Sequence, residues 1–296
     1  KIPTPNLEKL AKEGMIFTDG HSSSGICTPS RYALLTGRHH WRKFHGIVNA
    51  FGDSAFDADR LTMPEMLKEC GYDTAAIGKW HLGWNWDAIK KPGAKPIKQG
   101  KKSGYGPASF DWSKSIPNGP LDHGFDYYFG DTVINFPPYC WIENDKVVDT
   151  PDTMMDTSQW KEIKEGGWEC RPGPMFSGWD PYENIPTTTR KAVEYVKKQA
   201  SNDKPFFLYF AMNVPHANNE AGNKGMEVPD LGEFAKKNWP EPEKGFGAMI
   251  RNIDRDTGRI LDLLKELKIA RNTLVLFTSD NGPHQEGGHK ADYFDS

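Results

Sequence analysis

Apolar helical and apolar extended patterns alternate along the second half of the chain, and this alternation constrains the fold more than any other feature. A helix is predicted over 187–198, and an apolar and aromatic run at 206–211 then predicts a strand. A longer helix is predicted over 246–267, followed by a strand over 273–278. Helix–strand alternation of this kind predicts an α/β fold with a mainly parallel central sheet flanked by helices on both faces.

The first half of the chain carries shorter versions of the same elements. A helix is predicted to begin at the Thr4 cap and to end near Gly14, and a strand over 15–18 follows it. Thr62 is placed to cap another helix, and the apolar residues at 74–77 predict a short buried strand after it. These elements extend the predicted sheet towards the N-terminus.

Residues 84–180 lack this regularity. The region is rich in Gly, Pro, Trp and Tyr, and it includes a lysine-rich stretch over 90–102. We interpret it as a loop-rich excursion, of the kind that carries specificity, within a single domain over 1–296. Its aromatic residues are equally consistent with stacking on sugar rings and with packing beneath long loops.

The overall composition narrows the class of partner. Hydrophobic residues make up 37% of the chain and charged residues 26%, which is typical of a globular protein. The formal net charge is −3, which argues against non-specific nucleic-acid binding. No apolar run approaches the length of a membrane span, so we expect neither a nucleic-acid partner nor a membrane span.

Four predicted strands lead directly into reactive side chains. In open α/β sheets, ligands bind outside the carboxyl ends of the strands, so parallel strands would bring these side chains to one edge. We therefore expect a site at that edge. In chain order, the residues are Cys27 and Arg31, Lys79 and His81, Asn213 and His216, and Asp280 and Asn281.

Each of these residues, taken alone, has a second interpretation. Lys79 and His81 fit a solvated loop as well as they fit a site, and His216 after a proline fits an ordinary turn. The stretch 280–282 is also a good turn sequence. Cys27, beside a helix N-terminus that favours negative charge, could be an ordinary buried cysteine. Their convergence on one sheet edge is what favours a site.

The residues around Cys27 resemble a known signature. Cys-x-Pro-Ser-Arg at 27–31, followed by an apolar helix and the residues at 36–38, is similar to the signature of the type I sulfatases, in the alkaline phosphatase superfamily. In that family the cysteine is oxidised to formylglycine, an aldehyde. The resemblance continues through most of the chain, in Pro5-Asn6-Leu7, Gly78-Lys79-Trp80-His81-Leu82-Gly83, Pro215-His216 and Ser279-Asp280-Asn281-Gly282.

The resemblance implies a role for each residue. Hydrated formylglycine at Cys27 would attack sulfur and, together with Asp280 and Asn281, would bind Ca2+. Arg31 would orient the hydrated aldehyde. Three residues would handle the sulfate and its protons: Lys79 as a sulfate ligand, His216 as a sulfate ligand and the acid for the leaving alcohol, and His81 as the base that expels sulfate from the sulfated hemiacetal.

The chain also departs from the family pattern. Family members carry a paired-aspartate calcium motif on a strand upstream of the helix at Pro5, and a further active-site lysine and a smaller C-terminal domain downstream. We expect a sulfatase catalytic domain that is incomplete at both ends, without that first strand and that subdomain. Formylglycine further implies a formylglycine-generating maturation enzyme as a partner.

The substrate class is less constrained. A carbohydrate or glycosaminoglycan O-sulfate is our prediction, with an aryl sulfate as a further substrate; a phosphonate or phosphodiester hydrolase and a non-catalytic fragment are the alternatives. His284 is a candidate substrate-binding residue, although it and His289 lie in a glycine-rich loop where polar loop residues are expected. The absence of any Asn-x-Ser/Thr sequon favours a periplasmic or secreted bacterial protein over a lysosomal one.

Overall fold

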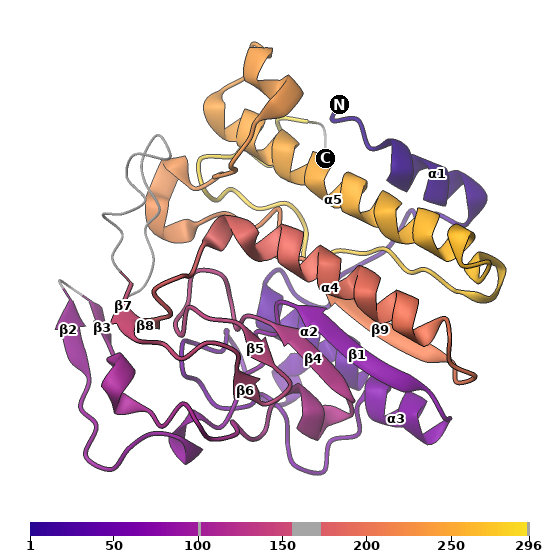
Figure 1. Cartoon of the computed structure of the whole chain (residues 1–296). Helices are drawn as coiled ribbons and strands as arrows, with labels where there is room; N and C mark the ends of the chain where they lie inside the picture. Colours follow the sequence, from indigo (N-terminus) through magenta and orange to yellow (C-terminus); the bar gives the residue numbers. More distant parts are fainter. Residues whose placement is uncertain (100–101, 156–172, 295–296) are drawn as a thin grey trace.

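A computed structural model describes residues 1–99, 102–155 and 173–294 of the chain. Its central sheet has the strand order β6-β5-β4-β1-β9 (Figure 1). Three of these strands are parallel, namely β4 (Tyr127–Gly130), β1 (Asp73–Gly78) and β9 (Phe206–Ala211). Two short antiparallel strands, β5 (Ile142–Glu143) and β6 (Lys146–Val147), extend one edge.

Helices cover both faces of this sheet, as predicted. Figure 1 shows α4 (Asn184–Gln199) on one face, with α2 (Cys27–Thr36) and α3 (Met63–Glu69) on the other. Because successive strand residues point to opposite faces, Ala75 and Ile77 pack with α4, whereas Ala76 packs with residues of α2. Both faces of β1 are therefore buried, as expected for a central parallel strand.

A second layer of helices lies over α4. The longest helix, α5 (Glu241–Glu266), contacts α4 on one side and α1 (Pro5–Glu13) on the other (Figure 1). The carboxylate of Asp254 accepts hydrogen bonds from the Leu7 N–H at 2.8 Å and from the Asn6 side chain at 2.8 Å, so α5 caps the start of α1. The predicted Thr4 cap makes no side-chain capping bond. Thr62, by contrast, caps its helix as expected, and it does so in a capping box with Glu65.

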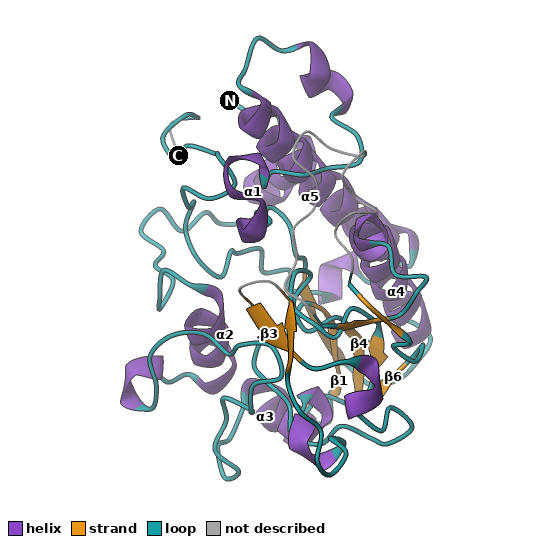
Figure 2. Ribbon diagram, turned by 90° about the vertical axis from the view of Figure 1, so that its left-hand side faces the viewer, coloured by secondary structure: helices purple, strands orange, loops and turns teal. Residues whose placement is uncertain are grey.

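The region between β1 and α4 contains short elements (Figure 2). Two small hairpins accompany the central sheet: β2 (Ile97–Gln99) with β3 (Lys102–Gly104), and β7 (Thr153–Met154) with β8 (Pro174–Met175). The described residues also form 3-10 turns: η1 (His40–Arg42), η2 (Trp86–Ala88), η3 (Pro107–Ser109), η4 (Pro120–His123), η6 (Pro181–Glu183), η7 (Asn219–Lys224), η8 (Gly232–Lys236) and η9 (Ala270–Asn272).

Two predicted strands are wrong. Residues 15–18 and 273–278 are extended segments without a strand pairing among the described residues. Most of their apolar side chains face solvent: Met15 is 76% exposed and Leu274 is 83% exposed, whereas Val275 is partly buried against residues of α4 and α5. An extended segment becomes a strand only when a neighbour satisfies its backbone groups, and neither segment has such a neighbour within the described part of the chain.

Candidate active site

The first turn of α2 holds Cys27, as predicted for a helix N-terminus. The helix begins at Cys27 and ends at Gly37, whose φ of 62° is the left-handed conformation that glycine adopts freely. The next residue, Thr28, donates its hydroxyl to the His81 carbonyl at 2.8 Å and accepts the Val48 N–H at 3.2 Å. These two bonds fix the start of α2 against the loop after β1, with Cys27 nearly buried.

Arg31 connects three segments of the site. Its Nε and Nη2 both lie 2.9 Å from Oδ2 of Asp280, and its Nη1 donates to the Lys79 carbonyl at 2.8 Å and the Tyr209 hydroxyl at 3.2 Å. Burial opposes the charge of Arg31, but the neighbouring Tyr209, Asp280 and Cys27 outweigh it and raise the Arg31 pKa. Burial acts against ionised Asp280 as well, but the charges of Arg31 and Lys79 lower its pKa.

Lys79 follows the last residue of β1. Gly78 has a φ of 104°, and a Cβ there would lie 2.1 Å from the Ala211 carbonyl oxygen, so only glycine lets β1 pass this close to β9. The Lys79 N–H donates to the same carbonyl at 2.9 Å. Burial lowers the pKa of the Lys79 ammonium. Electrostatic interactions nevertheless connect Lys79 to Cys27, Arg31 and Asp280, which places a buried cation beside the thiol.

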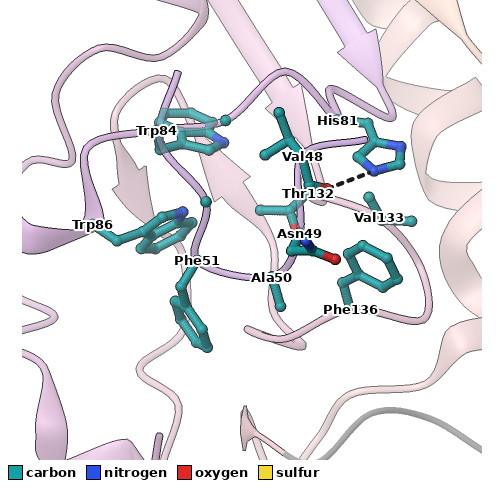
Figure 3. A pocket seen from close by; sticks show the side chains of 12 residues that line it. Val48, Asn49, Ala50, Phe51, His81, Trp84, Trp86, Thr132, Val133 and Phe136 are labelled. Atoms are coloured by element: carbon teal, nitrogen blue, oxygen red, sulfur yellow. Dashed lines mark hydrogen bonds between the residues drawn. The ribbon is translucent and has the colours of Figure 1, made fainter. Parts of the chain in front are cut away.

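His81 is buried and neutral. Its Nε2 lies 3.0 Å from the Val48 carbonyl oxygen, as Figure 3 shows. Because a carbonyl can only accept, Nε2 carries the proton, and Nδ1 keeps a lone pair. Nδ1 is buried without a hydrogen-bond partner among the described residues. Burial, together with the charges of Lys79 and Arg31, holds the His81 pKa well below its usual value.

The side chain of His81 also forms one wall of a small pocket. The rest of the pocket is mainly apolar and carries no charged side chain; its lining includes the aromatic residues Phe51, Trp84, Trp86 and Phe136 (Figure 3). Most of the ring surface is packed beneath loops: Trp84 and Trp86 are 1% and 3% exposed. For these two tryptophans, packing rather than an open stacking surface is observed.

His216 lies in the turn that follows β9. Its Nδ1 lies 2.6 Å from the Ala217 carbonyl oxygen and therefore donates, which leaves the Nε2 lone pair available. The charge of Lys79, with burial as the second cause, lowers the His216 pKa to about 4. The charge of Lys79 thus acts on both histidines, which are neutral and each keep one unprotonated ring nitrogen.

The structure separates the remaining candidates. Asp280 joins the cluster through Arg31, whereas the Asn281 amide donates to the Gly282 carbonyl at 3.0 Å. His284 is exposed and lies 3.4 Å from a Glu286 carboxylate oxygen. His289, expected to be a polar loop residue, lies in the glycine-rich loop with its side chain buried 2.6 Å from a Glu243 carboxylate oxygen on α5.

The described residues do not form a calcium site by themselves. Calcium takes about six to eight oxygen ligands. Oδ2 of Asp280 is occupied by the Arg31 guanidinium, and no group of three or more Asp, Glu, His or Cys residues converges as metal ligands in the described part of the chain. Further oxygen ligands would be needed to hold the ion at Asp280 and Asn281.

Sequence reasoning missed the residues behind the cluster. The strand β4 was not predicted individually, so Asp131, which directly follows it, was not recognised at the site edge. Asp131 and Asn184 are each 1% exposed, and Tyr209 on β9 contacts Arg31. An aromatic run followed by a glycine and an acidic residue, as in the sequence 127–131, is the signal that could have identified Asp131.

Residues 1–295 match the protein-family model described as sulfatase. The chain belongs to the sulfatase family. This membership confirms the resemblance seen around Cys27. None of the helices in the described ranges is both long enough and apolar enough to cross a membrane.

Curated relatives in the same family have a modest sequence identity to this chain. N-acetylgalactosamine-6-sulfatase of Homo sapiens is 30% identical over 306 residues, covering 94% of this chain and 45% of that protein. N-acetylgalactosamine-6-O-sulfatase of Bacteroides thetaiotaomicron is 29% identical over 328 residues, covering 100% of this chain and 57% of that protein. The chain spans about half the length of the curated relatives that it matches.

Solved structures confirm the fold. One solved structure belongs to a study of the metabolism of multiple glycosaminoglycans by Bacteroides thetaiotaomicron. It aligns with this chain with a TM-score of 0.73 at 26% identity, covering 99% of this chain and 60% of that one. The mostly parallel sheet with helices on both faces is therefore the sulfatase fold.

Proposed function

We propose that this protein hydrolyses sulfate esters of carbohydrates through a formylglycine at position 27. The observation that carries the proposal is the meeting of Cys27, Arg31, Lys79, His81 and His216 at the carboxyl ends of β1 and β9 and the start of α2. Formylglycine would supply a hydrated aldehyde whose hydroxyl is the nucleophile. The residues fit that group, since two buried cations lie beside Cys27.

Two buried cations favour the binding of an anion at this edge of the sheet. Lys79 and Arg31 are both at least nine-tenths buried, at 3% and 5% exposed, so their charges act through a medium less polar than water. The Arg31 charge is shared with Asp280, whereas no ion pair within 4.0 Å involves Lys79 in the described residues. Lys79 is therefore the group that we assign to a sulfate oxygen, with Arg31 orienting the residue at position 27.

The histidines supply the proton chemistry. With Nε2–H directed to Val48, His81 presents Nδ1 as a base that is already unprotonated at neutral pH. His216 presents Nε2, and its pKa of about 4 arises chiefly from the Lys79 charge. A sulfate bound to Lys79 offsets that charge, raises the His216 pKa and lets His216 take up the proton that the leaving alcohol needs.

Calcium stays a prediction for this site. The ion would be held by Asp280 and Asn281 only together with oxygen ligands beyond the described set. A formylglycine-generating enzyme as a partner and a periplasmic or secreted location stay predictions of the same kind.

The substrate proposal follows the relatives. Since two of them are N-acetylgalactosamine 6-sulfatases, we propose a sulfated hexosamine within a glycosaminoglycan as the substrate. The test measures sulfate release from N-acetylgalactosamine 6-sulfate and nitrophenyl sulfate, beside nitrophenyl phosphonate and phosphodiester analogues. Faster hydrolysis of the sulfates than of the phosphorus analogues supports the proposal. Lys79→Ala should lose this preference, and the exposed control Lys204→Ala should keep it. Faster hydrolysis of the phosphorus analogues would contradict it.

A further inference from the structure

Asp131 lies at the end of β4, beside the ends of the two other parallel strands. Lys79 follows β1 and Asn213 follows β9 by two residues, so the three parallel strands place all three side chains at one edge. The loops after β4 and β1 run together: the Trp80 N–H donates to the Asp131 carbonyl at 3.4 Å, and the His81 N–H donates to the Thr132 carbonyl at 3.1 Å. Asp131 is thus built into the backbone frame of Lys79 and His81.

Two buried amides hold the Asp131 carboxylate. The Asn184 side chain donates to Oδ2 at 3.0 Å, and the Asn213 side chain donates to Oδ1 and Oδ2 at 3.2 and 3.3 Å. Asn213 Nδ2 also donates to Asn184 Oδ1 at 2.9 Å, which closes the network. Because a carboxylate only accepts, Asn213 must turn its Nδ2 towards Asp131 and its Oδ1 away.

The network reaches His216 through Asn213. The His216 N–H donates to the Asn213 carbonyl at 3.2 Å, so the turn that carries the histidine is anchored on the residue that Asp131 orients. Asn213 is 5% exposed, and its Oδ1 is buried without a hydrogen-bond partner among the described residues. A buried acceptor left free at this edge is what a site awaiting a donor requires.

The Asp131 carboxylate lies among two cations and two neutral acids. Lys79 and Arg31 act on it by charge, whereas burial raises the pKa of both Tyr128 and Cys140 and keeps them neutral. No cation lies within 4.0 Å of the carboxylate in the described part of the chain. Burial, partly offset by the Asn213 bond, raises the Asp131 pKa to about 6. A buried carboxylate without a direct ion pair is costly to keep unless it serves a function.

We infer that Asp131 is a positioning residue of the sulfate-binding edge: its bonds to Asn213 and Asn184 fix the turn that carries His216, and its negative charge lies at the same sheet edge as buried Lys79. This inference rests on the proposed function. In this role Asp131 acts as a counter-ion although it does not contact the substrate. Protonation of Asp131 in weak acid would lower the pKa of Lys79 and weaken the binding of an anion to it.

The competing role, a purely structural one, predicts different behaviour of Asp131→Asn. The amide has nearly the shape of the carboxylate and keeps an acceptor for one of the two asparagines, but it brings no charge to bury. A positioning residue so replaced leaves the fold as stable or more stable while function falls. A structural residue so replaced lowers the melting temperature and leaves anion binding alone.

The experiment compares Asp131→Asn with Asp126→Asn in the full-length protein. Asp126 is a fair control because it precedes the same strand at its other end and bonds Thr74 and Lys68. Asp131→Asn should raise the Kd for inorganic sulfate about tenfold and lower the Lys79 titration, followed by its 13Cε resonance, by about one pH unit, without lowering the Tm. Asp126→Asn should leave both the sulfate Kd and the Lys79 titration unchanged.

Two outcomes overturn the inference: an unchanged Lys79 titration in Asp131→Asn, or a lowered Tm with unchanged sulfate affinity. Lys79→Ala separates this failure from failure of the proposed function. If Lys79→Ala abolishes sulfate binding and Asp131→Asn does not weaken it, only the positioning role is wrong. If Lys79→Ala binds sulfate like the natural protein, the assignment of Lys79 to sulfate is wrong, and the Lys79 titration still decides the role of Asp131.

Discussion

The strand β1 and the segment over 273–278 are both short apolar stretches that end at a reactive residue, yet they have opposite fates. In β1, Ile77 is fully buried between β4 and β9. In the other segment, Leu276 is 77% exposed and no strand pairs with it in the described ranges. An apolar extended pattern therefore marks a segment that can become a strand, and the presence of a pairing neighbour decides whether it does.

The candidate site residues differ in the same way, according to whether they follow a paired strand or the unpaired segment over 273–278. Residues after the paired strands are buried and fixed by several bonds, as Lys79 and His81 are. Of the described residues after 273–278, only Asp280 joins the cluster, and it does so through Arg31, whereas His284 stays exposed. Substitutions in the two regions should therefore differ in the size and kind of their effects.

The largest effect is expected at the start of α2. Cys27→Ala removes the residue that becomes the nucleophile, so sulfate release should fall on the order of a thousandfold or more. The Tm should change little, because the substitution leaves in place the two Thr28 bonds that fix the start of α2. Sulfate release and a thermal melt of the same sample check this; retained activity would remove Cys27 from the chemistry.

Arg31→Ala should have the largest effect on stability. It leaves the Asp280 carboxylate without its ion pair and removes bonds to Lys79 and Tyr209, at a cost of about 3–5 kcal/mol for a broken buried pair. Urea unfolding measures the change. Arg271→Ala, beyond α5 and away from the cluster, is the control. A loss of less than about 1 kcal/mol would show that the pair is effectively exposed.

The stability of the fold should fall in weak acid through His216. Its folded pKa of about 4 lies below an ordinary value of 6.5, so the unfolded chain binds a proton first, and the contribution present above pH 6.5 is lost as the pH falls towards 4. The loss at pH 4.5 is about 2–3 kcal/mol. The folded pKa of Asp131 is raised from its ordinary 3.8 to about 6, so here the folded protein binds the proton first. Protonation of Asp131 therefore raises the free energy of unfolding as the pH falls from about 6 to 3.8.

The contribution of His216 is therefore measured as a difference. Urea unfolding of the natural protein and of His216→Gln at pH 7 and pH 4.5 should show a smaller loss in the variant. Equal losses in both proteins would mean that His216 titrates near its ordinary value and that the Lys79 charge does not act on it.

The smallest effect is expected in the unpaired segment. Leu276→Ala in residues 1–296 should change the unfolding free energy by less than about 0.5 kcal/mol, whereas Leu35→Ala on α2, 1% exposed, should cost about 2–5 kcal/mol. The same pair of variants in a longer gene product sharpens the contrast. A cost above about 2 kcal/mol for Leu276→Ala there would mean that a further strand covers the segment.

The sequence allowed the strongly periodic elements to be predicted, because their burial depends on neighbours close in the chain or on long apolar faces. The helices α4 and α5 and the strand β9 were predicted within a few residues, and β1 with them. The strand β4 was missed because it is four residues long and lies within a loop-rich region, where its pairing with β1 and β5 defines it.

The site was predictable to a similar degree. Residues that follow predicted strands, such as Lys79 and His216, could be placed at one edge from the sheet alone. Side-chain partners from distant segments could not: neither the pairing of Arg31 with Asp280 nor the burial of His289 against Glu243 follows from a local pattern. Such contacts depend on how α2 and α5 pack, which single-sequence periodicity does not specify.

The mass of the peptide that contains Cys27, taken from active protein produced together with a formylglycine-generating enzyme, tests the central claim most directly. Replacing the CH2–SH of cysteine by an aldehyde lowers the mass, unlike the sulfenic, sulfinic and sulfonic oxidations of a thiol, each of which adds oxygen. We predict that peptide at the lowered mass, in a fraction that rises in step with sulfate release. Full sulfatase activity in protein whose Cys27 is entirely an unmodified thiol would contradict the account.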